Sequence, residues 1–144
     1  MEYYGEERIQ FSAIRNSGPD HIASNEIITF TQINLNTGDA FNMETGVFTA
    51  PFHGVYEFQF SGLSNNFDKW IQIDVLMNDS KQFEITNYNG HGVTGKPWEN
   101  VNFSWSFKMT KNDRVFLKSV RSNGLHIYPG KHHTYFSGKL AMKF

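Results

Sequence analysis

Six histidines are the side chains of this sequence best suited to metal binding or acid–base chemistry. None of them has the H-E-x-x-H spacing of a zinc site, and no cysteine is present to supply a thiolate. No G-x-S-x-G elbow presents a serine nucleophile. We therefore expect no enzymatic activity and interpret most of the histidines as loop residues. They are His21, His53, His91, His126, His132 and His133.

A polar stretch before the last expected strand combines side chains that bind hydroxyl groups and anions. Its histidines gain positive charge below pH ~6.5. Because binding residues occur disproportionately on loops, we interpret this set as the first candidate for ligand contact. A solvated loop is the alternative interpretation. The set is Arg121, Ser122, Asn123, His126, Lys131, His132 and His133.

The segment from Gly90 to Gly95 matches the G-x-G-x-x-G spelling of a dinucleotide site. That site needs a helix that opens at the third glycine and presents its N–H groups to the phosphates. Lys96 and Pro97 follow instead, and no helical periodicity is present. We interpret the segment as a flexible loop.

Two acceptor sequons for N-glycosylation begin at Asn78 and Asn102. They matter only if the protein passes through a secretory pathway. Asn102 falls on the polar side of an expected strand, which permits a glycan without requiring one.

The charge balance argues against several partners. Thirteen basic and fourteen acidic residues leave a net charge of −1, with no long run of like charge, which argues against a dedicated nucleic-acid or anionic-membrane surface. No apolar run approaches the ~20 residues that span a bilayer, so we expect no membrane insertion. The acidic start, MEYYGEER, is unlike a signal peptide, so a secreted form would need a leader not present in this sequence.

Alternating hydrophobicity dominates the 144 residues. Tyr56, Phe58 and Phe60 fall on every second position and share one face of a strand. Phe107 lies in a similar stretch from 101 to 109, and we expect Phe58 and Phe107 to be buried. The same reasoning predicts one buried face in 71–77. In 136–144 it places Phe136, Gly138, Leu140, Met142 and Phe144 on one face.

Weaker strand patterns cover residues 9–14, 27–33 and 114–120, and turn signals separate them. Many short strands at regular spacing predict an all-β fold, either a sandwich or a jelly roll. The length suits one domain with a substantial core.

A spaced set of aromatic, asparagine and glycine positions then carries a family resemblance. It comprises Phe30, Asn36, Phe41, Phe48, Gly54, Tyr56, Phe58 and Phe60. This set resembles the signature of the complement C1q globular-head family, within the C1q and tumour necrosis factor superfamily. The likeness extends over most of the chain, from IQFSAIRN through KNDRVFLKS to FSGKLAMKF.

The resemblance implies a two-sheet jelly-roll β-sandwich whose aromatics are mainly core residues. Residues 1–8 would form an N-terminal extension and residues 9–144 the head domain. It also implies an extracellular homotrimer that binds ligands rather than transforming them. The sequence departs from the family in two ways: no collagen-like stalk precedes the head, and the cysteine of some members is replaced by Ala50.

Three functional hypotheses remain open. The first is a recognition module of the kind used in innate immunity, which binds glycans, microbial surface components or protein partners in a lectin-like way. The second is a cytokine-like or synapse-organising trimer that engages a cell-surface receptor. The third is a metal-ion or mineral binding protein that uses histidines and carboxylates.

Calcium is the cofactor that the resemblance implies. Several family members bind it near the trimer apex, through a side-chain oxygen before the sixth long strand and carbonyls slightly upstream. Alignment on KNDRVFL brings that position to Glu99, whose carboxylate is a suitable hard ligand. An exposed glutamate without a ligand is the alternative.

Overall fold

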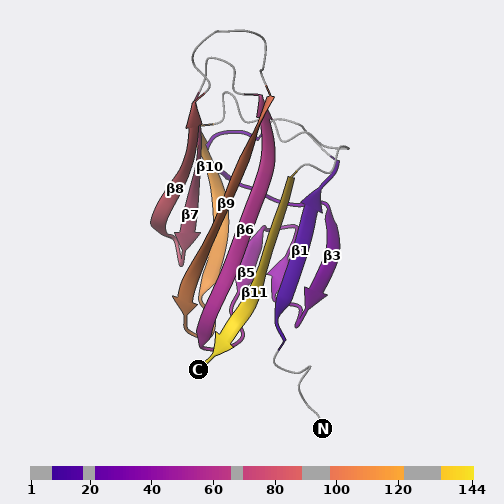
Figure 1. Cartoon of the computed structure of the whole chain (residues 1–144), viewed down its shortest axis with the longest axis vertical. Coiled ribbons are helices and arrows are strands. Elements are labelled where there is room, and N and C mark those ends of the chain that lie inside the picture. Colours follow the sequence, from indigo (N-terminus) through magenta and orange to yellow (C-terminus); the bar gives the residue numbers. More distant parts are fainter. Residues whose placement is uncertain (1–7, 18–21, 66–69, 89–97, 122–133) are drawn as a thin grey trace.

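The structure, a computed structural model, describes residues 8–17, 22–65, 70–88, 98–121 and 134–144. Every regular element within these ranges is a β-strand, and the strands form two antiparallel sheets. Figure 1 shows strands of both sheets running along the long axis, with the C-terminus at the lower end, which we call the C-terminal end. The prediction of an all-β, two-sheet jelly roll is confirmed.

Sheet I has five strands, in the order β3-β1-β11-β6-β9, and sheet II has six. Sheet II runs β4-β5-β10-β7-β8, with β2 paired to β10. The strands of sheet I are β3 (Gln32–Thr37), β1 (Gln10–Arg15), β11 (Thr134–Lys143), β6 (Gly54–Asn65) and β9 (Trp98–Met109). Those of sheet II are β4 (Phe41–Asn42), β5 (Val47–Thr49), β10 (Arg114–Arg121), β7 (Trp70–Met77), β8 (Ser80–Tyr88) and β2 (Glu26–Ile27).

Aromatic rings fill the space between the sheets. Tyr56, Phe58 and Phe60 are 0%, 2% and 0% exposed, so the alternation in β6 predicted the buried face correctly. From β1, the ring of Phe11 stacks on Phe41 with centroids 4.3 Å apart. The buried Tyr56 hydroxyl donates a hydrogen bond to the carbonyl of Phe52 at 2.7 Å, which satisfies its polar group.

The central part of β9 is less buried than its alternation predicts. Val101 and Met109 are buried, but Phe107 is only half-buried and Phe103 is 40% exposed. These two rings are partly exposed because β9 is the last strand of sheet I. The expectation that Phe107 is buried is therefore wrong in degree, whereas the one for Phe58 is confirmed.

Two segments differ from the sequence-based expectation. Residues 27–33 do not form one strand, because Ile27 ends β2 and β3 begins only at Gln32. The edge strand β8 was not predicted, since Lys81, Gln82 and Glu84 dilute its alternation.

The last strand contains a β-bulge that changes which side chains face solvent. Leu140 pairs with Tyr56 and Met142 pairs with the next residue, Val55, so Ala141 is an extra residue in β11. Paired residues share a face, and Val55 lies on the outer face because its neighbour Tyr56 is buried. Met142 therefore points outward and is 57% exposed, and Phe144 is 54% exposed. The prediction that Met142 and Phe144 face the core is wrong.

Gly54 lets the two strands approach closely at this bulge. A Cβ atom at this position would lie 2.2 Å from the carbonyl oxygen of Met142. Only glycine fits there without moving β11.

Two turns are joined at the C-terminal end. Asn78 and Asp79 form the turn between β7 and β8 with φ of 53° and 69°, the left-handed values of a two-residue hairpin. The Asn78 amide donates to Asp113 at 2.7 Å and accepts from the Arg114 N–H at 2.9 Å. The turn that follows β9 is thereby fixed to the turn that follows β7.

Candidate functional site

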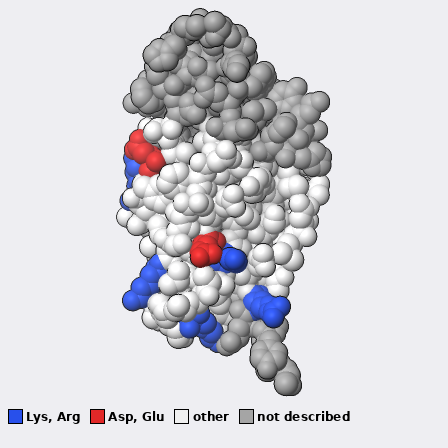
Figure 2. Space-filling model, in the orientation of Figure 1, with Lys and Arg blue, Asp and Glu red and all other residues white. Residues whose placement is uncertain are grey.

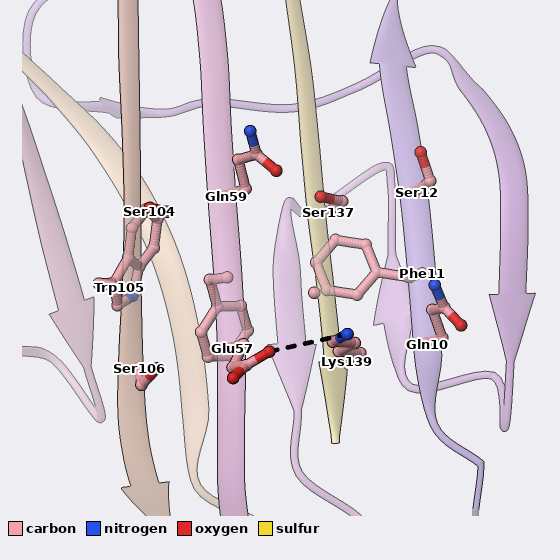
Figure 3. A pocket seen from close by; sticks show the side chains of 12 residues that line it. Gln10, Phe11, Ser12, Glu57, Gln59, Ser104, Trp105, Ser106, Ser137 and Lys139 are labelled. Atoms are coloured by element: carbon pink, nitrogen blue, oxygen red, sulfur yellow. Dashed lines mark ion pairs between the residues drawn. The ribbon is translucent and has the colours of Figure 1, made fainter. Parts of the chain in front are cut away.

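A polar groove of about 660 Å³ lies on the outer face of sheet I (Figure 3). Its polar side chains occupy the alternate positions of strands whose other positions face the core. Glu57 and Gln59, for example, alternate with the buried rings of β6. The polar lining comprises Gln10, Ser12, Glu57, Gln59, Ser104, Ser106, Ser137 and Lys139.

The groove contains one ion pair among otherwise neutral groups. Glu57 and Lys139 face each other on β6 and β11, and their charged atoms are 3.8 Å apart. Both side chains are about half exposed, so the pair contributes little to the stability of the single chain. Within the described part of the chain, the hydroxyl and amide groups of Gln59, Ser104 and Ser137 form no hydrogen bond, so they are available to a partner.

An aromatic edge lies beside the groove, where β9 and β8 end the two sheets. The ring of Phe83 on β8 lies 5.1 Å from that of Phe103, 5.5 Å from that of Trp105 and 6.1 Å from that of Phe107. The indole nitrogen of Trp105 is buried and has no hydrogen-bond partner among the described residues. Within the described ranges no further strand lies beyond this edge, and Phe103, 40% exposed, leaves an apolar surface open.

A third surface, which we call the C-terminal patch, consists of Val55, Lys108, Met142 and Phe144. The first three form one row across sheet I, because Val55 pairs with Met142 on β11 and with Lys108 on β9. The Lys108 ammonium lies 5.5 Å from the centroid of the Phe144 ring, within the range of a cation–π contact. Figure 2 shows Lys and Arg side chains gathered at this end of the face.

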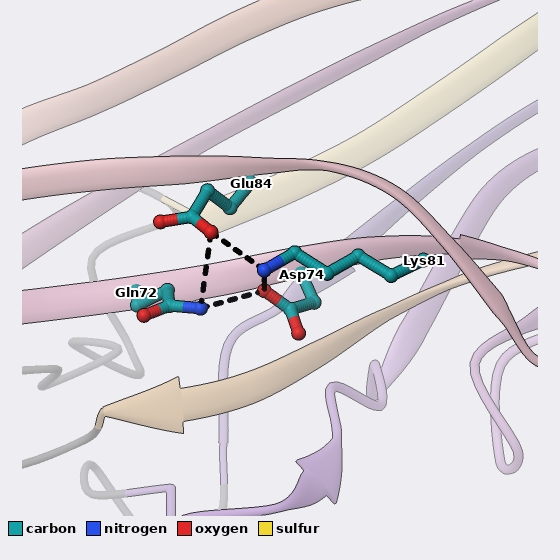
Figure 4. A network of polar contacts seen from close by, with 4 residues as sticks. All are labelled: Gln72, Asp74, Lys81 and Glu84. Atoms are coloured by element: carbon teal, nitrogen blue, oxygen red, sulfur yellow. Dashed lines mark hydrogen bonds and ion pairs between the residues drawn. The ribbon is translucent and has the colours of Figure 1, made fainter.

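Sheet II carries a polar network on β7 and β8 (Figure 4). Asp74 and Glu84 are directly opposite each other, which would be unfavourable for two like charges. The Lys81 ammonium lies 2.5 Å from Glu84 and 3.4 Å from Asp74 and offsets that repulsion. Its hydrogen bond to Glu84, with further help from Asp74, raises the pKa of Lys81. We interpret the network as structural, because the cation between the carboxylates is already a side chain.

Most residues of the predicted ligand-contacting set lie outside the described residues. Arg121 is described as the last residue of β10, where it pairs with Gln72. The structure therefore does not test whether the set forms one surface, and this stays a prediction. The members outside the described ranges are Ser122, Asn123, His126, Lys131, His132 and His133.

The predicted metal ligands are also untested. Glu99 is the second residue of β9 and pairs with Ser64, so it lies among the first residues of the strand rather than in the loop before it. The described ranges contain no group of three His, Cys, Asp or Glu side chains that could hold a metal ion. His53 is the one histidine within those ranges, and its ring packs edge-on against Phe144 at 5.0 Å.

Both sequon asparagines make hydrogen bonds. Asn102 accepts one from the Ser61 hydroxyl at 2.5 Å, and Asn78 joins the two turns described above. The Asn102 amide lies on the outer face of sheet I.

Sequence reasoning missed the groove and the aromatic edge. The groove had a signal, since Ser104 and Ser106 alternate with the aromatics of β9. The aromatic edge had no such signal in the sequence. Pairing between distant segments decides which strand lies at the end of a sheet.

Comparison with known proteins gives a consistent result. The family model described as "C1q domain" matches residues 10–141. Complement C1q tumor necrosis factor-related protein 3 from Homo sapiens is 30% identical over 102 residues, which is 71% of this chain and 39% of that protein. "Heavy metal-binding protein HIP" from Mytilus edulis is 27% identical over 85 residues, 59% of this chain and 39% of that protein. The chain thus matches about two fifths of the length of these relatives.

Solved structures show the same fold. The globular domain of zebrafish complement 1qA protein has a TM-score of 0.76 at 19% identity, over 94% of this chain and 99% of that one. Murine APRIL at pH 5.0 has a TM-score of 0.68 at 12% identity, over 92% and 98% of the two chains. In the described residues, no helix is long and apolar enough to cross a membrane.

Proposed function

Because the chain belongs to the C1q domain family, whose members are non-enzymatic recognition and ligand modules, we propose that it is an extracellular recognition module that acts as a homotrimer. Its ligands are glycans, microbial surface components or protein partners. Domains of this family form trimers, and the outer face of sheet I and the aromatic edge supply two different unpartnered surfaces for such an assembly.

The single observation that supports the proposed trimer is that one chain presents both of these surfaces. The edge is apolar, with Phe103 40% exposed, and the face is polar, with unused hydrogen-bonding groups around Gln59 and Ser104. When two different surfaces of one chain bind each other in neighbouring copies, the contact is head-to-tail. Such contacts form a closed ring when the rotation from each copy to the next brings the last copy back to the first. The edge of one copy would then lie on sheet I of the next.

We assign ligand binding to the seven candidate polar residues between positions 121 and 133. Their hydroxyl, amide, imidazole and ammonium groups suit sugars and anions. The test is binding of the wild-type trimer to a glycan array and to whole microbes, with free sugar as competitor. Alanine replacement of all seven candidate residues should abolish the competed signal. Retention of that signal by the sevenfold variant would move the binding site elsewhere.

The alternative is a trimeric ligand for a cell-surface receptor. It is favoured by the likeness to a tumor necrosis factor-related protein and by the APRIL fold. Saturable binding to a cell-surface protein, insensitive to free sugars, would select this function over glycan recognition.

Metal-ion binding is a further alternative, supported by the relative named as a heavy metal-binding protein. Five of the six histidines lie outside the described residues, so the geometry does not test it. Zinc or copper uptake that is lost when the histidines are replaced would select it.

A further inference from the structure

Met142 is presented to solvent by the bulge in β11. Its side chain is 57% exposed, whereas Met43 and Met77 are half-buried and Met109 is 1% exposed. Among the methionines within the described ranges, Met142 therefore has by far the most accessible sulfur. Strict alternation would have placed it in the core with Leu140, so the extra residue Ala141 creates this exposure.

The surroundings of Met142 are apolar and cationic. It pairs with Val55, which pairs in turn with Lys108, and Phe144 lies two residues further along the chain with 54% of its surface exposed. The carboxylate of Glu57, in the next row of sheet I, is already paired with a lysine.

A thioether in this position reacts readily with peroxides, whereas a buried thioether is shielded. The sulfur lone pair attacks one oxygen of hydrogen peroxide, the O–O bond breaks, and the other oxygen leaves as water after proton transfer. The sulfur loses two electrons and becomes a sulfoxide, and the peroxide gains those electrons. The product is a polar, chiral group where an apolar one stood.

We propose that Met142 is a modification site for peroxide-class oxidants and that its sulfoxide weakens self-association across sheet I. The second half rests on the proposed homotrimer. The C-terminal patch adjoins the polar groove, because Val55 and Glu57 are two residues apart on the outward side of β6. A copy that covers the groove would also cover the patch.

Oxidation changes the energetics of covering this patch. Val55, Met142 and Phe144 supply its apolar area, while Lys108 supplies a positive charge. A sulfoxide oxygen must lose its water when it is covered, and no donor in the row besides Lys108 replaces that water. The oxidised chain therefore associates more weakly than the reduced chain.

The first measurement is the order of oxidation under limiting hydrogen peroxide, followed by peptide mass spectrometry of the intact chain at low concentration. Among the four methionines within the described ranges, Met142 should be converted first, about tenfold faster than the buried Met109. Conversion of Met43 or Met77 ahead of Met142 would overturn the proposed site. At high concentration, assembly should slow the conversion of Met142.

The second measurement is the light-scattering mass before and after peroxide. Wild type should shift toward the monomer, and a methionine sulfoxide reductase should restore the mass. Met142→Leu should show the same mass before and after treatment, Met142→Gln should mimic the oxidised chain without peroxide, and Met77→Leu should respond as wild type does.

The outcomes separate the two proposals. A wild-type chain that is trimeric and stays trimeric with Met142 fully oxidised overturns the inference but not the proposed function. A chain that is monomeric before peroxide overturns the homotrimer and with it the effect on assembly, and the order of oxidation still decides the modification site.

Discussion

The ring of Phe83 on β8 lies 5.1 Å from the ring of Phe103 on β9, and this contact bridges the two sheets where both end. Since β9 is the last strand of sheet I and β8 the last of sheet II, no further strand of the described ranges covers the core at this edge. Phe103 is 40% exposed in the single chain. An aromatic contact that is half open to water is a surface suited to a protein partner, because covering it removes apolar area from solvent.

Truncation of two aromatic residues should destabilise the protein by different amounts, because one residue lies in the closed core and the other at the open edge. Phe58→Ala should lower the free energy of unfolding by about 3–5 kcal/mol, because it leaves a cavity among rings that are fully buried. Phe107→Ala should cost clearly less, since Phe107 is half-buried at the edge. Urea unfolding of both variants checks this, and equal losses would contradict the burial difference.

The pH dependence of stability should reflect Asp113. Burial pushes its pKa upward, but hydrogen bonds from Asn78 and Thr110 outweigh this and lower the pKa below the ordinary value. The carboxylate therefore stabilises the fold above the unfolded pKa of about 3.9, and this contribution is lost as the pH falls through the lower folded value. Asp113→Asn should be less stable at pH 7, with a flatter decline below pH ~4. Parallel stability curves for the two proteins would show that Asp113 has no such role.

Gly54→Ala should disturb the junction between β6 and β11. Its Cβ would lie 2.2 Å from the Met142 carbonyl oxygen, so β11 must move. We expect a loss of about 1–3 kcal/mol, measured by thermal unfolding. Gly62→Ala is the matched control on the same strand, because its nearest neighbour would be a Phe60 ring atom at 3.3 Å, and it should cost less. The opposite order would refute the close approach.

Calcium binding at Glu99 is a prediction that carboxylate chemistry supports. If three copies meet near the strand entrance, their like charges should be relieved by a bound cation. Calcium should raise the thermal midpoint of wild type relative to chelator, with weak affinity of the kind that extracellular modules show, and Glu99→Gln should abolish the difference. Identical midpoints for both proteins with and without calcium would dispose of the site.

The sequence predicted the parts of the fold where one face of a strand is fully buried. Tyr56, Phe58 and Phe60 illustrate this, because a strand with one oily face has one favourable register. The exposure of Met142 and Phe144 was missed because a bulge adds a residue that alternation does not encode. The strand β8 was missed because an edge strand tolerates polar residues on both faces.

The candidate surfaces were less predictable than the fold. The groove follows from the polar positions of β9, such as Ser104, once β9 is known to lie beside β6. The exposure of Phe103 depends on β9 ending its sheet, which is set by pairing across the whole chain rather than by local pattern. Local sequence pattern therefore indicated polar positions that line the groove but not the open aromatic edge.

Self-association through the aromatic edge is measured by the light-scattering mass of wild type and Phe103→Thr at micromolar concentration. Wild type should give three times the monomer mass of 16.6 kDa, and Phe103→Thr should shift toward the monomer. Ile27→Thr is the matched control, because Ile27 on β2 is 37% exposed but lies away from that edge, and it should remain trimeric. A wild-type chain with the monomer mass, or a Phe103→Thr variant as fully trimeric as wild type, would rule out self-association through this edge.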